Sequence, residues 1–136
     1  RISENLMAQV TLGTPHIAGY SRDGKANGTM MSVQALSRYF NLGKDYWQPA
    51  NVEEPTDPVI TIPEGVNDGA VLPFCIHQTY QVAIDDVALR HNLKDFEKLR
   101  GDYPVRREFG SFTVQKSFTD ENLEKKLLQL GFKIER

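Results

Sequence analysis

One histidine stands out among the side chains that could carry chemistry in this sequence. His16 directly follows Thr14-Pro15, at the end of a stretch predicted to be a strand, and a helix is predicted to begin a few residues later. In open α/β sheets, ligands bind in the loops beyond the carboxyl ends of strands. An imidazole exchanges protons near neutral pH, so a histidine in such a loop can act as a general acid or base. A single loop histidine also fits a structural or surface role, and the residue pattern leaves both interpretations open.

The other histidines and the cysteine suggest no metal site. The three histidines of the chain show no metal-ligand spacing with Cys75 or with nearby carboxylates, so we expect no metal. There is no Gly-x-Gly-x-x-Gly pattern, and neither Gly24-Lys25-Ala26 nor Gly43-Lys44-Asp45 continues as a P-loop requires. We therefore expect the sequence to contain no phosphate-binding loop of its own.

Two charged groups have more than one interpretation. Adjacent residues on a helix point about 100° apart, so we expect Asp85-Asp86 to cap a helix or to lie on its exposed face. The run Arg106-Arg107-Glu108 could bind an anion, but its composition favours a solvated run of charges.

Composition limits the class of protein. The 136 residues are 40% hydrophobic and 25% charged, which is typical of a soluble globular protein. A formal net charge of −2 argues against a dedicated nucleic-acid binder. No run approaches the ~20 apolar residues that span a bilayer. With one cysteine and no signal pattern after Arg1, we expect a cytoplasmic protein.

The first 43 residues predict a strand, a loop and a long helix. Residues 6–12 (LMAQVTL) suggest a short buried strand, or the end of a helix that runs into one, and Pro15 breaks the pattern. From residue 23 to about residue 40, apolar residues recur every three or four positions, which predicts a helix that Ser21 or Asp23 could cap. Gly24 and Gly28 each cost roughly 1 kcal/mol relative to alanine in a helix, so we expect close backbone approach there.

The second region predicts a small α+β layer. Residues 43–58 contain three prolines and no sustained period, which makes them an irregular linker and the best domain boundary. Beyond it, we expect short strands over 59–62, 111–116 and 132–135. Helices are predicted over 67–91, with a break at Asp85-Asp86, then before Gly101, and finally from about residue 120 to Gly131. The expected fold class is α+β, with a sheet of about three strands packed with helices.

Two motif blocks resemble one enzyme family. Residues 14–20 (TPHIAGY) resemble the catalytic-histidine segment of the D-2-hydroxyacid dehydrogenases. The continuation at residues 24–29 (GKANGT) is similar to one branch, the erythronate-4-phosphate dehydrogenases of pyridoxal phosphate (vitamin B6) biosynthesis. Residues 85–108 carry the second block, which resembles the C-terminal dimerisation domain of that branch. The matching residues are 85–86 (DD), 89–90 (LR), 96–100 (FEKLR), Tyr103 and 106–108 (RRE). Leu130-Gly131-Phe132 fits as well, so the resemblance covers nearly the whole chain.

The resemblance implies roles for three residues of the first block. His16 matches the catalytic histidine, which takes the proton of the substrate's 2-hydroxyl as hydride leaves C2 for NAD. Gly19 matches a backbone position that contacts NAD, and Tyr20 matches a residue that contacts the phosphorylated substrate. The glutamate that orients the histidine, the arginine that holds the substrate carboxylate and the glycine-rich NAD loop lie upstream in the family. They are not in this sequence, so we expect a C-terminal fragment that is inactive on its own.

The resemblance also implies an organisation and partners. Residues 1–43 would be the remnant of a Rossmann-type nucleotide-binding and catalytic domain, residues 44–51 a linker, and residues 52–136 a dimerisation domain that forms a homodimer. Arg106 or Arg107 would lie at the interface or contact the substrate phosphate. The intact enzyme would oxidise 4-phospho-D-erythronate to 2-oxo-3-hydroxy-4-phosphobutanoate. The alternative is a non-catalytic dimerisation or regulatory module, of the ACT kind found on some hydroxyacid dehydrogenases, in which His16 is vestigial.

Overall fold

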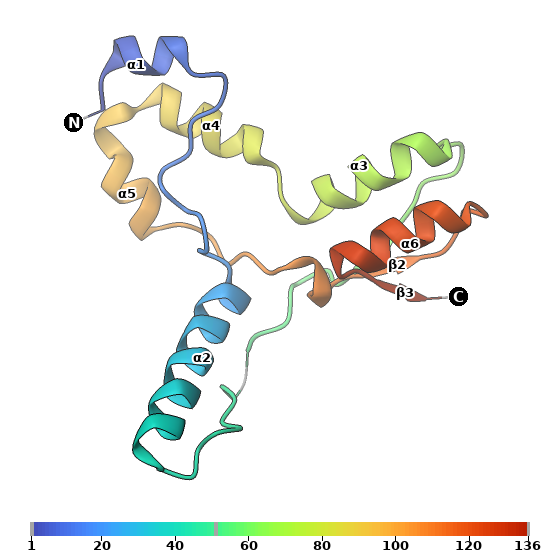
Figure 1. The fold of residues 1–136 in the computed structure, drawn as a ribbon. Coiled ribbons are helices and arrows are strands. Elements are labelled where there is room, and N and C mark those ends of the chain that lie inside the picture. Colours follow the sequence, from blue (N-terminus) through green and yellow to red (C-terminus); the bar gives the residue numbers. More distant parts are fainter. Residues whose placement is uncertain (1, 51, 136) are drawn as a thin grey trace.

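The computed structural model describes residues 2–50 and 52–135. Asn51, the last residue of the predicted linker, lies outside the described residues, as do Arg1 and Arg136. The described elements form three groups (Figure 1). Helix α1 lies beside α4 and α5, the sheet lies with α3 and α6, and α2 projects away from these two groups. The helices are α1 (Glu4–Gln9), α2 (Arg22–Phe40), α3 (Asp68–Thr79), α4 (Val82–His91), α5 (Phe96–Gly101) and α6 (Glu121–Leu130), with short 3-10 turns η1 (Leu93–Asp95) and η2 (Phe109–Ser111).

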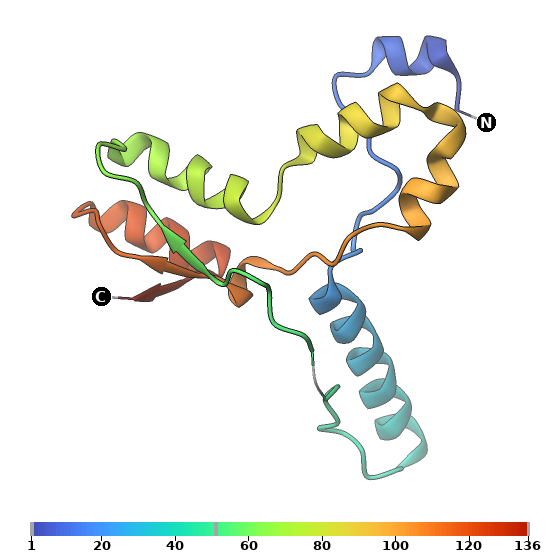
Figure 2. The ribbon, with the colours of Figure 1, turned by 180° about the vertical axis from the view of Figure 1, so that it is seen from behind.

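The sheet confirms the predicted α+β class. It has three short strands, β1 (Val59–Thr61), β2 (Thr113–Gln115) and β3 (Lys133–Glu135), in the order β1-β2-β3. Both pairs are parallel, and Figure 2 shows the strands side by side from behind. In the central strand, Val114 lies opposite Ile60 and Ile134. Parallel strands need crossover connections, which α3 to α5 provide between β1 and β2, and α6 provides between β2 and β3.

The core lies where α3 and α6 pack with the sheet. Leu127, Val114 and Cys75 are fully buried in one cluster that draws on both helices and the strands. Helix α6 has the bounds that the sequence predicted: Gly131 ends it at φ 102°, and the side chain of Asp120 caps its start. Burial raises the pKa of the Cys75 thiol to about 11, so this cysteine is an inert core residue rather than a nucleophile.

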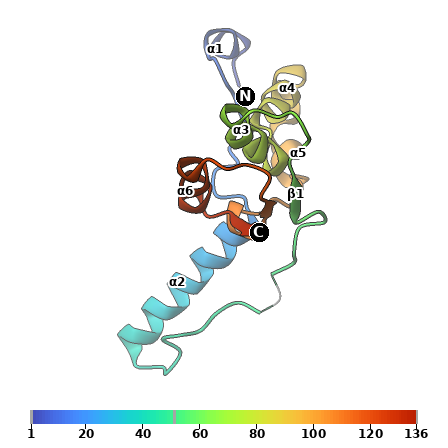
Figure 3. The same ribbon diagram turned by 90° about the vertical axis from the view of Figure 1, so that its right-hand side faces the viewer.

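Helix α2 forms as predicted but is poorly covered. The Ser21 hydroxyl accepts a hydrogen bond from the Gly24 amide at 2.9 Å, and Asn41 ends the helix in the left-handed conformation. The predicted apolar face is only partly covered, with Leu36 and Phe40 more than half exposed. Figure 3 shows this helix extending away from the rest of the chain.

Two sequence expectations about elements were wrong. Residues 6–12 form no strand; residues 4–9 are helix α1, so the alternative of a helix end is correct for the first of these residues, and the backbone beyond α1 pairs with no described strand. A strand needs a neighbouring strand for its backbone hydrogen bonds, and within the described chain side chains of α4 bind this backbone instead. The helical break falls at Tyr80-Gln81 rather than at Asp85-Asp86. Asp85 belongs to the first turn of α4, where a carboxylate is favourable.

Candidate functional site

His16 lies in the loop between α1 and α2. Its neighbours Pro15 and Ile17 are buried, whereas His16 is exposed. Its φ of 57° is in the left-handed region, and its amide donates to the Thr14 carbonyl at 2.8 Å. A residue other than glycine in this conformation is uncommon and is enriched at functional sites. No hydrogen bond occupies its imidazole among the described residues, so the ring is available to a ligand.

Gly19 follows in the same loop with its backbone accessible. Its φ is 73°, a conformation that favours glycine, and a Cβ added there would meet nothing within 4 Å. A ligand can therefore approach the backbone closely at this position.

Tyr20 is half-buried between two cations and a second aromatic ring. The Lys25 Nζ lies 4.2 Å from the centre of its ring, and the Arg100 Nη2 donates to its hydroxyl at 3.3 Å. The edge of Tyr103 packs against the ring at a centroid distance of 6.0 Å. The Arg100 Nε is buried and makes no hydrogen bond to the described residues. Lys25 therefore lies over the face of the ring and Arg100 binds its hydroxyl, and two positive side chains beside one tyrosine suit an anionic group.

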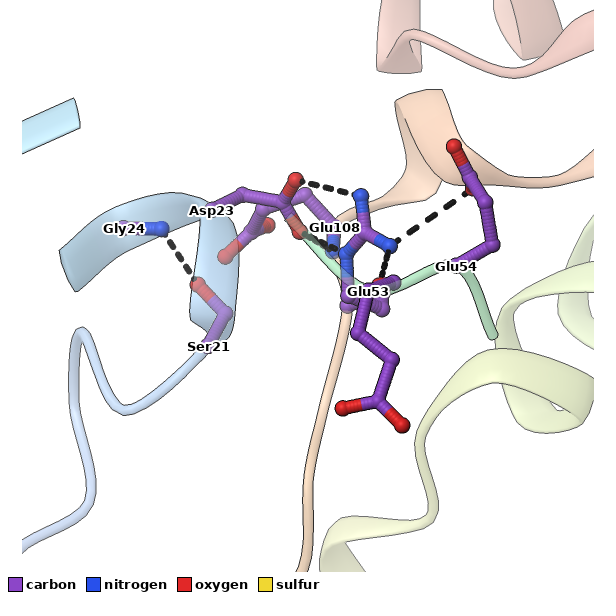
Figure 4. Close-up of polar contacts among 7 residues, drawn as sticks. Ser21, Asp23, Gly24, Glu53, Glu54 and Glu108 are labelled. Carbon is purple, nitrogen blue, oxygen red and sulfur yellow. Dashed lines mark hydrogen bonds and ion pairs between the residues drawn. The ribbon is translucent and has the colours of Figure 1, made fainter. Parts of the chain in front are cut away.

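Arg107 is buried and paired, contrary to the expectation of a solvated run. Its side chain is 7% exposed, and its Nε and Nη2 donate to the two carboxylate oxygens of Asp23 at 2.9 and 3.0 Å. Its Nη1 donates to the Glu53 carbonyl and lies 3.6 Å from the Glu54 carboxylate. Figure 4 draws these contacts as dashed lines that reach Asp23, Glu53 and Glu54.

Asp23 is a fixed anion at the start of α2. Burial raises the pKa of its carboxyl, but the hydrogen bonds from Arg107 and from the Glu108 amide lower it by more, so the pKa is below its ordinary value. Arg106 differs from its neighbour: it is half-buried, stacks over the Tyr80 ring at 4.4 Å, and pairs with no carboxylate among the described residues.

Asp85 and Asp86 also depart from the sequence expectation, because both are only partly exposed and make specific bonds. Asp85 accepts hydrogen bonds from the hydroxyls of Tyr80 and Tyr103, each at 2.8 Å, beside a cavity of about 300 Å³. Burial, together with this carboxylate, raises the pKa of both tyrosines, so they remain donors. Asp86 accepts from the Gly13 amide at 2.6 Å and from the Arg90 Nε at 2.8 Å.

The residues that the sequence predicted for the site lie in two different parts of the structure. His16, Gly19 and Tyr20 share one loop, whereas Arg106 and Arg107 follow α5 and meet the start of α2. The sequence missed Arg90 and Arg100, which contact this loop from about 80 positions away. A weak local signal existed for Arg90, since it lies four residues after Asp86 on a helix.

Within the part of the chain that the structure describes, no cluster of His, Cys, Asp or Glu could hold a metal ion. No helix among those described is long and apolar enough to cross a membrane.

Comparisons with known proteins point to one group. Residues 53–131 match a domain of unknown function, DUF3410. The chain is 33% identical to an erythronate-4-phosphate dehydrogenase of Marinobacter nauticus over 98% of its length, and 41% identical to one of Bacteroides fragilis over 83%. It is 38% identical to one of Yersinia pestis over 96%. The chain spans only 30–37% of the length of these three relatives.

Proposed function

We propose that this chain, which belongs to the DUF3410 family, is the C-terminal part of an NAD-dependent erythronate-4-phosphate dehydrogenase. The observation that carries the proposal is the extent of the match, since 83–98% of the chain aligns with enzymes of that name. The match therefore runs well beyond residues 53–131 and toward the histidine loop. The intact protein would oxidise 4-phospho-D-erythronate to 2-oxo-3-hydroxy-4-phosphobutanoate, a step of pyridoxal phosphate biosynthesis.

In this proposal His16 is the general base. Oxidation of the substrate removes two hydrogens: the hydroxyl proton goes to the imidazole of His16, and C2 loses a hydride as its bond to oxygen becomes double. NAD, when bound, accepts that hydride. The imidazole of His16 is exposed and makes no hydrogen bond to the described residues, so it is free to accept the proton. In the family a glutamate outside this sequence orients the ring.

Gly19 and Tyr20 would contact the two ligands. The open backbone at Gly19 fits close approach by the cofactor, because no side-chain atom would fill that space. Tyr20 fits contact with the substrate phosphate, because Lys25 and Arg100 flank it with positive charge. Arg106 is the better candidate of the two arginines for a further phosphate or interface contact, because Arg107 is already bound to Asp23.

We further propose that residues 1–43 complete the nucleotide-binding and catalytic domains, that residues 44–51 are the linker and that residues 52–136 form a homodimer. The end strands β1 and β3 each have one neighbour within the described sheet, which leaves edges that a second copy could cover. One buried cysteine and no disulfide suit a reducing compartment, so we place the enzyme in the cytoplasm.

The test is the variant His16→Ala in the intact enzyme, followed through the formation of NADH. Loss of a general base typically costs ~10² to 10⁴ in rate, so we expect kcat to fall at least 10²-fold while NAD affinity is nearly unchanged. His77→Ala is the control, because His77 is an exposed histidine on α3. Near-normal turnover of the His16 variant would indicate that this residue has a structural role and is not the general base. If the intact wild-type protein did not oxidise the phosphorylated acid, the non-catalytic module would be the better description.

A further inference from the structure

We infer that the DUF3410 region positions the acid/base loop, and that Asp86, Arg90 and Arg107 are positioning residues for His16. The inference rests on the proposed function and assigns the domain a role beyond pairing subunits. All three residues lie within residues 53–131, and each binds the backbone or a side chain close to the loop.

The upstream anchor is on α4. The Asp86 carboxylate accepts a hydrogen bond from the Gly13 amide at 2.6 Å, three residues before His16. The same carboxylate holds the Arg90 Nε at 2.8 Å, and the two remaining nitrogens of Arg90 donate to the Met7 and Val10 carbonyls at 2.6 and 2.8 Å. One planar guanidinium thus binds two backbone carbonyls and a carboxylate in fixed directions, whereas a lysine presents its three donors from a single nitrogen. These bonds take the place of a strand partner for residues 7–13.

The downstream anchor is at the start of α2. Arg107 binds both carboxylate oxygens of Asp23, and the Glu108 amide donates to Asp23 at 2.7 Å. The Arg22 amide donates to the Arg106 carbonyl at 2.8 Å. The segment after α5 therefore lies against the first turn of α2, which the loop enters directly after Tyr20.

These contacts concentrate around the histidine rather than along the chain. The described side-chain hydrogen bonds between residues 2–43 and residues 53–135 all reach positions between Met7 and Asp23. Most of α2 beyond its first turn is exposed. Misplacing a catalytic group by about 1 Å can cost ~10²-fold in rate. Two multidentate anchors on either side of a short loop are suited to prevent such a displacement.

The first arm of the test measures the loop itself in the full-length enzyme. Hydrogen–deuterium exchange of peptides covering residues 14–21 is compared for wild type, Arg90→Gln, Arg107→Gln and the control Lys98→Gln. Lys98 pairs with Asp102 on the surface of the same region, and neither side chain bonds to residues 2–43 among the described contacts. We expect exchange in the loop to rise about tenfold in the two anchor variants and to stay unchanged in the control. Exchange in β2 and α6 reports whether the core remains folded.

The second arm measures kinetics in the same proteins. We expect kcat to fall about 10- to 100-fold in both anchor variants with little change in the KM for NAD. Arg90→Lys and Arg107→Lys keep the positive charge, so they should fold even if a glutamine variant is unstable. We expect the kcat of each lysine variant to lie between those of the glutamine variant and the wild type. Unchanged loop exchange in all anchor variants would overturn the inference, and so would a loosened loop with a normal kcat. A wild-type enzyme without dehydrogenase activity would contradict the proposed function instead, while the exchange data would still decide the anchoring.

Discussion

The guanidinium of Arg107 and the carboxylate of Asp23 are joined by two hydrogen bonds across 84 positions of sequence. Arg107 is 7% exposed and Asp23 20% exposed, so the pair is largely withdrawn from water. Removing one partner of such a pair leaves a buried charge that the remaining contacts satisfy poorly. The link is therefore sensitive to substitution in a way that a surface ion pair is not.

We predict that Asp23→Asn destabilises the chain near neutral pH, by about 3 kcal/mol. The folded-state pKa of Asp23 is below its ordinary value, so the carboxylate contributes stability above the unfolded-state pKa of about 4. That contribution is lost as the pH falls through the lower folded-state pKa. Thermal unfolding at a series of pH values should therefore show wild type and variant converging below about pH 4.

Asp102→Asn is the control for this prediction, because its pair with Lys98 is exposed. We expect it to change the melting temperature little at any pH. A constant difference between wild type and Asp23→Asn from neutral to acid pH would contradict the assigned ionisation.

The elements that the sequence predicted well have local signals. Helix α6 has a cap at Asp120 and a glycine at 131, and the three strands alternate or are bounded by breakers. The strand predicted over residues 6–12 was wrong because strand formation depends on a neighbour, which a single segment does not reveal.

In the candidate site, too, residues with a local sequence signal could be predicted, and residues placed by tertiary packing could not. His16, Gly19 and Tyr20 are adjacent in sequence, so a motif could identify them together. The pairing of Arg107 with Asp23 is set by tertiary packing, and the composition of the run Arg106-Arg107-Glu108 favoured a solvated surface. No local pattern distinguishes a buried arginine from an exposed one, because the partner decides its burial.

We predict opposite effects of alanine at two glycines. Gly131 has a φ of 102°, so Gly131→Ala places a Cβ in an unfavourable conformation and should destabilise the fold by about 1–2 kcal/mol. Gly28 lies inside α2 with open space around it, so the close backbone approach expected from the sequence is absent there, and Gly28→Ala should stabilise the chain by about 0.5–1 kcal/mol. Urea unfolding of the two variants measures both changes. A loss of stability in Gly28→Ala would indicate that α2 needs close backbone approach at this position.

We predict that this 136-residue polypeptide does not bind NAD tightly and does not turn over the substrate. Dinucleotide affinity in such folds comes largely from a pyrophosphate at a helix N-terminus and a carboxylate on the ribose. The sequence has no glycine-rich loop that could supply the first of these contacts. Isothermal titration calorimetry with NAD should show no binding at micromolar concentrations, and a micromolar dissociation constant would contradict the prediction.

We predict that the chain forms a homodimer through residues 52–136 and that Arg106 lies at or near the interface. Short end strands, and exposed apolar side chains such as Val59 and Leu128, are surfaces that a two-fold partner could cover. Arg106 is half-buried and has no carboxylate partner among the described residues, so its guanidinium is available to a second copy. Sedimentation equilibrium at roughly tens of micromolar should show a dimer.

Substitution at Arg106 separates this interface from a general loss of stability. Arg106→Glu reverses the charge where we expect the partner, so it should weaken the dimer about tenfold or more while the circular dichroism spectrum stays unchanged. Lys98→Glu makes the same charge change on an exposed side chain of α5 and should leave the dimer intact. A monomeric wild-type chain would contradict the dimer itself. A dimer that Arg106→Glu does not weaken would place this arginine outside the interface, stacked on Tyr80 within its own chain.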